Sequence, residues 1–287
     1  MVKTTVRVLF VAVLVSPAGS RAAPAQPSSS AYAIILGGGK TVSDAEEAAQ
    51  RYRSATALTA PQGFPKITAS SDVPGLNPGF VIAIAGFCSS EEHARLARDV
   101  LNLDAPGVYI KKVGVAASAG TCPTSRADLK TDWTGYSVKA TQRVASSGKH
   151  LLWESLETSG RCRRVGLRLK WGTTLVATRA FEGDQCEPDG TRVWFASRPL
   201  EIGQRTFWLV TKATDWVHAG KEDYSLVGFA CGEIRELYVA AGFGDPAEVV
   251  IEPSREEPEG WRELVVTLNG ESSHVLWNAS SCRYELK

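Results

Sequence analysis

Six cysteines are the residues whose number and spacing most directly indicate a chemistry. The chain holds no Cys-x-x-Cys pair, and no cysteine and histidine stand at zinc-ligand spacing, so disulfides are favoured over a metal site. Six cysteines allow many alternative pairings, and the sequence does not choose among them. Proximity along the chain favours the following pairs: Cys88 with Cys122, Cys162 with Cys186, and Cys231 with Cys282.

Four histidines and scattered serines and acidic residues give no catalytic pattern. The histidines lack HxxxH and HExxH spacing, and the chain has no Gly-x-Ser-x-Gly elbow to support a serine hydrolase. His218 has the most polar neighbourhood and is interpreted as a loop residue. The remaining histidines lie on predicted strands or on a helix: His93, His150 and His274. The histidine pattern therefore indicates neither a catalytic site nor a metal site.

Two further motifs suggest a phosphate-binding loop and a calcium-binding loop, but their residues do not have the spacing that such loops require. Gly37–Thr41 ends in Gly-Lys-Thr, but Ile34 stands where a phosphate loop requires its first glycine, so a turn is expected there. The carboxylates of Asp184, Glu187 and Asp189 do not follow the spacing of an EF-hand calcium loop. The sequence therefore indicates no metal and no cofactor.

The eight tryptophans all follow residue 130, which divides the chain into two compositionally different parts. Five lie inside apolar runs and are expected in a core: Trp153, Trp171, Trp194, Trp208 and Trp277. Trp133, Trp216 and Trp261 have polar neighbours instead. Because an exposed indole ring can stack on a sugar ring, these three are the candidate ligand-binding residues of the second part.

The charge and the first 25 residues indicate a compartment. Lys3 and Arg7 precede the apolar run Val8–Val15 and then small residues, which is the order of an export signal. This run is far shorter than the roughly 20 residues that span a bilayer. Removal of residues 1–25 would leave 29 basic and 31 acidic residues, a net charge of −2. We expect a periplasmic or secreted protein, without a membrane span, that does not bind nucleic acid.

Residues 31–113 combine short strands with two amphipathic helices. Helices are predicted over 43–53, with Ser43 as N-cap and Glu46 at the capping-box position, and over 89–101. The predicted strands are 31–36, 65–68, 80–85 and 108–113. This order predicts an α+β domain, preceded by a linker over 26–30 and followed by one over 114–130.

The two halves of this domain repeat with an offset of 49 residues. The repeat aligns a strand residue, a turn glycine and the apolar face of each helix: Ile35 with Ile84, Gly37 with Gly86, Ala45 with Ala94, Ala48 with Ala97, and Tyr52 with Leu101. The segment from Ile82 to Ala94, a strand, a glycine, serines and a helix with paired alanines, resembles the SPOR domain, the sporulation-related repeat. The resemblance covers about 31–113.

The resemblance to the SPOR domain implies a four-stranded antiparallel sheet backed by two helices. It also implies a bacterial envelope protein that binds peptidoglycan glycan strands lacking their peptides. The family places polar residues two positions before the turn glycine, where this chain has Ile35 and Ile84. With Ala33 and Ile82 beside them, they would form an apolar sheet face, which is costly if exposed. We therefore expect this face to pack against the second domain or a partner.

Residues 131–287 are expected to form an all-β sandwich or barrel-like domain that resembles no family we recognise. Eleven short runs rich in Val, Leu, Trp and Thr are separated by Gly, Asp or Pro. The leading hypothesis is a non-enzymatic exported envelope protein that binds peptidoglycan or another surface glycan. The alternative is a secreted module whose β domain binds a protein or carbohydrate while the first domain serves as a scaffold.

Overall fold

The computed structural model describes most of the chain from residue 30 onward. The described ranges are 30–54, 57–115, 121–125, 132–144, 150–159, 163–181, 192–203, 205–216, 219–243, 249–254 and 262–287. The expected export signal over 1–25 lies outside these residues. No helix in the described ranges is both long enough and apolar enough to cross a membrane.

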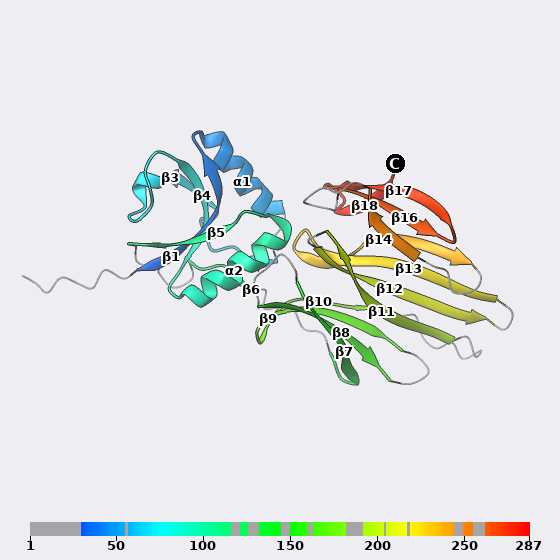
Figure 1. Cartoon of the computed structure of the whole chain (residues 1–287). Helices are drawn as coiled ribbons and strands as arrows, with labels where there is room; N and C mark the ends of the chain where they lie inside the picture. The colour runs from blue at the N-terminus through cyan, green and yellow to red at the C-terminus, as the bar shows by residue number, and fades with distance from the viewer. Residues whose placement is uncertain are drawn as a thin grey trace, which may run out of the picture.

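The first domain is a four-stranded antiparallel sheet with two helices on one face (Figure 1). Its strand order is β3-β4-β1-β5, and we call it sheet I. The elements are β1 (Ala31–Gly39), α1 (Val42–Ser54), β2 (Leu58–Thr59), β3 (Lys66–Ala69), the 3₁₀ turn η1 (Ser70–Asp72), β4 (Val81–Cys88), α2 (Glu91–Asp104) and β5 (Tyr109–Val113). The expected α+β class and the four antiparallel strands are confirmed.

Local hydrogen bonds fix where the two helices begin. The Ser90 hydroxyl accepts the His93 N–H at the start of α2, as expected for an N-cap. At α1, the Thr41 N–H donates to the Asp44 carboxylate and the Asp44 N–H donates to the Thr41 hydroxyl. The capping box therefore joins Thr41 to Asp44, two residues earlier than the expected pair of Ser43 and Glu46.

The internal repeat brings its own two halves together. Ile35 and Ile84, which the 49-residue offset relates, are direct cross-strand partners on β1 and β4. Ile34 faces the other side of the sheet and lies in an apolar cluster with the helix residues Ala48 and Ala97. Alternation along the strands thus gives sheet I two apolar faces, of which the helices cover one.

The second apolar face is covered from within the first domain. Residues 70–80, which we call the cover loop, include η1, connect β3 to β4, and place Val73 and Leu76 against this face. The cluster comprises Ala31, Ala33, Ile35, Val73, Ile82, Ile84 and Val113, with Phe64, Leu76, Phe87 and Val115 packed against it. The expectation that this face is buried agrees with the structure. Its assignment as the surface that packs against the second domain was wrong, because the cover loop occupies it.

Part of the expected linker over 114–130 is folded onto the first domain. Cys122 forms a disulfide with Cys88, and the short strand β6 (Thr124–Ser125) pairs with β2. A Cβ atom on Gly86 would lie 2.4 Å from the Thr121 carbonyl oxygen, so the close approach of this segment to β4 requires glycine there. The expected pairing of Cys88 with Cys122 is confirmed.

In its described residues, the second domain contains three four-stranded antiparallel sheets, each formed by consecutive strands. Sheet II contains β7 (Tyr136–Arg143), β8 (Leu151–Thr158), β9 (Val165–Trp171) and β10 (Thr174–Phe181). Sheet III contains β11 (Arg192–Ile202), β12 (Arg205–Trp216), β13 (Ala219–Ala230) and β14 (Glu233–Phe243). Sheet IV contains β15 (Val249–Pro253), β16 (Glu263–Leu268), β17 (Glu271–Asn278) and β18 (Arg283–Leu286).

The three sheets stack as layers, with sheet III in the middle (Figure 1). Along β12, Trp208 and Val210 belong to the apolar cluster shared with sheet II, whereas Phe207 and Leu209 belong to the cluster shared with sheet IV. The continuous apolar run of this strand is explained by burial on both faces. The domain is thus a sandwich extended by a third layer rather than a barrel. Cys231 and Cys282 form the expected disulfide, which joins the β13–β14 turn to sheet IV.

The two domains meet at the C-terminal half of α2. The apolar cluster between sheets II and III continues into the helices of the first domain. Asp99, only 2% exposed, accepts the indole N–H of Trp171 at 3.1 Å and a guanidinium hydrogen bond from Arg98. Asp104 accepts the backbone N–H groups of Cys231 and Gly232 at 3.1 and 2.9 Å. Helix α2 is therefore the contact surface for the second domain.

Candidate functional site

A cleft of about 340 Å³ lies on the loop-covered side of sheet I. This volume falls in the range of small-ligand sites. The cleft is lined by Gly37, Gly38, Ser70, Leu76, Asn77, Phe80, Ile82, Tyr109 and Lys111. It is therefore bounded by the end of β1, by β5 and by the returning arm of the cover loop.

Hydrogen bonds at both ends of the cover loop shape this cleft. The Ser70 N–H donates to the Phe80 carbonyl oxygen at 2.8 Å, and the Phe80 N–H donates to the Ser70 hydroxyl. At the far end of the loop, the Gly114 N–H donates to the Pro74 carbonyl oxygen at 2.7 Å, next to β5. A loop with closed ends and a docked tip is a compact Ω-type loop. It covers the centre of the sheet face and the Val113 end of β5, and it leaves Tyr109 and Lys111 exposed.

Register places the side chains of β5 in the cleft. Tyr109 pairs with Ile35 and Lys111 pairs with Ala33, so both point to the loop-covered side. Two aromatic residues of the lining are exposed, Phe80 at 44% and Tyr109 at 47%. Partial burial raises the pKa of Tyr109, which keeps its hydroxyl protonated and able to donate at neutral pH. The cleft thus offers aromatic rings beside polar side chains.

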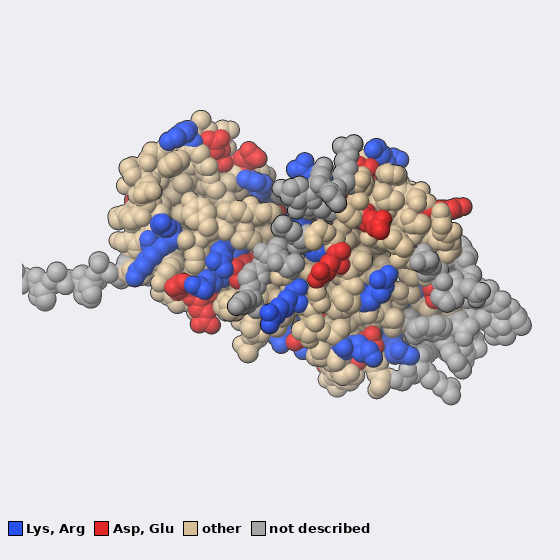
Figure 2. Space-filling model, viewed as in Figure 1, with Lys and Arg blue, Asp and Glu red and all other residues tan. Residues whose placement is uncertain are grey.

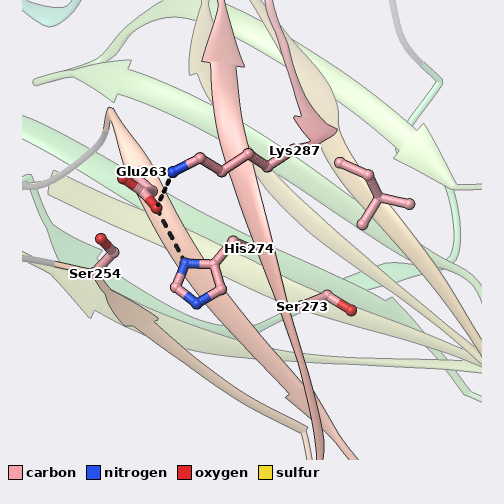
Figure 3. Close-up of a pocket in the computed structure, with 6 residues that line it drawn as sticks. Ser254, Glu263, Ser273, His274 and Lys287 are labelled. Carbon is pink, nitrogen blue, oxygen red and sulfur yellow. Dashed lines mark hydrogen bonds and ion pairs between the residues drawn. The ribbon is translucent and has the colours of Figure 1, made fainter.

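A second, more open hollow of about 710 Å³ lies on sheet IV (Figure 3). Glu263 accepts a hydrogen bond from His274 Nδ1 at 3.0 Å and pairs with Lys287 at 3.5 Å. The hydrogen bond from His274 and the charge of Lys287 lower the pKa of Glu263. Ser273 points away from the His274 ring in Figure 3. Ser254, the other serine of the hollow, hydrogen-bonds to Glu263, and no hydrogen bond joins a serine of the described chain to the His274 ring.

Of the three tryptophans proposed as ligand-binding residues, only the side chain of Trp133 lies within the description. Trp133 is half-buried: it packs edge-on against Tyr136, and a Cβ on Gly166 would lie 2.1 Å from its ring. Trp216 ends β12, but its side chain lies outside the description. Trp261 lies outside the described residues altogether. The role of Trp133 is therefore packing over Gly166, and sequence reasoning missed Tyr109 and Phe80, which lie in the cleft.

Several other residues singled out from the sequence lie outside the described ranges. They are Cys162, Cys186, Asp184, Glu187, Asp189 and His218. Within those ranges, no group of three or more His, Cys, Asp or Glu side chains is arranged to hold a metal ion. His93 is exposed on α2, and the ring of His150 lies 5.2 Å from that of Trp171. His150 thus contributes to packing rather than to a site.

Asp104 at the domain contact gives a prediction for the pH dependence of stability. Burial raises its pKa from 3.8 to about 7, although the N–H groups of Gly232 and Cys231 and the charges of Arg205 and Arg235 act in the opposite direction. The folded protein therefore holds this proton more tightly than the unfolded chain. Stability from this group is complete below about pH 4 and is lost as the pH rises to about 7.

Asp104→Asn is expected to remove this dependence of stability on pH. Because Asp104 is partly exposed, we expect wild type to lose about 2 kcal/mol between pH 4 and 7 relative to the Asn variant. Urea unfolding at a series of pH values measures it. Asp132→Asn, which removes an exposed carboxylate of the second domain, serves as the control. If the free energies of unfolding of wild type and Asp104→Asn change with pH in parallel, the raised pKa of Asp104 is contradicted.

The fold and cleft define an α+β domain with a ligand-sized groove, joined to a three-layer β domain. No family model matches the chain, and neither curated proteins nor solved structures gave a match.

Proposed function

We propose that the chain is a non-enzymatic, exported protein of the bacterial envelope that binds a glycan strand in the cleft of the first domain. The observation that carries this proposal is the pair of exposed rings, Phe80 and Tyr109, in a groove with the polar side chains of Asn77 and Ser70. Sugar rings offer an apolar face and a rim of hydroxyls. A groove with aromatic and hydrogen-bonding groups suits both.

Two properties of the chain support an envelope location. The disulfides Cys88–Cys122 and Cys231–Cys282 favour an oxidising compartment. The first 25 residues have the pattern of an export signal. In the cytoplasm both disulfides would be subject to reduction.

The resemblance to the SPOR domain supports peptidoglycan as the source of the glycan. The four antiparallel strands and two helices agree with that architecture. The resemblance implies a glycan lying over the centre of the sheet, which the cover loop occupies in this chain. We therefore place the glycan strand along β5, beside Tyr109. For the alternative, a binding surface on the second domain, the one candidate whose side chain is described, Trp133, packs over Gly166.

Tyr109→Ala tests this proposal. Loss of the ring removes most of the apolar contact with a sugar, and we expect binding to weaken by about tenfold. The mature chain is sedimented with purified sacculi, before and after amidase treatment, and the bound fraction is measured. Val42→Ala alters an exposed residue of α1, on the opposite side of the sheet, and should bind as wild type does. Absence of wild-type binding to both preparations would refute the proposal.

A further inference from the structure

Charges are divided unequally between the two sides of the first domain. Residues 30–115 contain eight acidic and eight basic side chains, so the domain as a whole is balanced. Seven of the eight acidic residues lie on α1 and α2, which cover one face of sheet I: Asp44, Glu46, Glu47, Glu91, Glu92, Asp99 and Asp104. Figure 2 shows acidic side chains over α1 and over the start of α2. The cleft lies on the other face.

Lysines predominate on the side of the cleft. Lys111 lines it directly and forms no ion pair with any described residue. Lys40 places its ammonium 4.2 Å from the centre of the Phe80 ring and donates to the Gly79 carbonyl oxygen at 3.2 Å. Lys66 pairs with Ile84 and so shares this side, at the opposite edge of the sheet. Lys111 and Lys40 thus place two ammonium groups in or beside the groove.

The eighth carboxylate does not neutralise this charge within the cleft. Asp72 lies in η1 and accepts hydrogen bonds from the hydroxyls of Thr68 and Ser71, at 3.2 and 3.5 Å. No carboxylate is among the side chains that line the cleft. An anionic ligand would therefore meet Lys111 from the cleft wall and Lys40 across the Phe80 ring, with hydroxyl and amide groups beside them.

We propose that the cleft selects a negatively charged glycan, in which a carboxylate or phosphate on the strand pairs with Lys111. This inference rests on the proposed glycan binding and adds the chemical class of the ligand. The neighbouring Tyr109 ring contacts the sugar and the ammonium group contacts its charge. A charged hydrogen bond of this kind is commonly worth a tenfold change in affinity or more.

The probe that tests this is glycan released from amidase-treated sacculi, which carries free carboxylates, compared with the same glycan after its carboxylates are capped as neutral amides. Binding of the full chain to each is measured by calorimetry. We expect the free acid to bind about tenfold more tightly, with the difference shrinking as salt is raised. Displacement by soluble poly(glycerol phosphate) would identify phosphate as the preferred anion, and lack of displacement would identify carboxylate.

Variants of the neighbouring lysines on β5 provide the matched control. Lys111→Gln should abolish the preference for the free acid, and Lys111→Arg should restore most of it. Lys112 points to the helix side of the sheet, so Lys112→Gln should change the affinity by less than about twofold. Equal binding of capped and free glycan would overturn the charge inference and leave glycan binding intact. Binding of neither would overturn both proposals.

Discussion

Replacement of Trp208 by alanine is expected to destabilise the protein by about 3–5 kcal/mol, a large part of the stability of an ordinary domain. Trp208 is 0% exposed and lies on the central strand of the middle layer, facing sheet II. Truncation leaves a cavity between sheets II and III, and sheet III cannot move in to fill it without losing its packing on sheet IV. Urea unfolding monitored by circular dichroism measures the loss.

Two further variants serve as controls for Trp208→Ala. Val239→Ala changes an exposed residue of β14 in the same sheet and should shift stability by less than about 0.5 kcal/mol. Trp208→Phe keeps a ring in the layer and removes an indole N–H that has no partner among the described residues. It should cost much less than alanine. A loss below about 1 kcal/mol for Trp208→Ala would contradict the three-layer packing.

Removal of the Cys231–Cys282 disulfide is expected to cost about 2–4 kcal/mol. The bond closes a loop with a sequence separation of 51 residues, and its loss gives the unfolded chain more conformational freedom. It also holds the turn whose N–H groups bind Asp104 on α2. The double variant Cys231→Ala and Cys282→Ala leaves no unpaired thiol from this bond. Its unfolding midpoint in urea is compared with that of wild type.

Reduction distinguishes loss of this bond from damage to packing. A reducing agent should lower the stability of wild type toward that of the double variant and beyond it, since Cys88–Cys122 is then also reduced. The double variant should respond less to the same reagent. Unchanged stability of the double variant would show that the β13–β14 turn does not depend on its link to sheet IV.

Much of the secondary structure follows from local patterns. The alternation of apolar residues and the turn residues predict both helices and eleven of the twelve strands of the second domain. The sequence pattern does not predict β18, because this strand is short and follows directly after the Cys282 turn. The layered arrangement has a signal in the continuous apolar run of β12, which indicates burial on both faces and hence a central sheet.

The site and the domain contact depend on long-range contacts that local patterns do not reveal. The Pro/Gly-rich composition of residues 72–79 predicts a loop, but not that Val73 and Leu76 cover the Ile35 and Ile84 face. Asp104 lies beyond the predicted helix over 89–101, and no local pattern indicates its contact with the β13–β14 turn. Trp133 has polar neighbours in sequence and packs over Gly166, 33 positions away.

The central claim is that a glycan binds along β5, beside the cover loop. The most direct test is an NMR titration of the isotope-labelled mature chain with soluble glycan from amidase-treated sacculi. The amide signals of Gly37, Gly38, Tyr109 and Lys111 should shift in a saturable way, whereas those of sheet IV around His274 should not. Saturable shifts confined to the second domain, or none at all, would contradict the account.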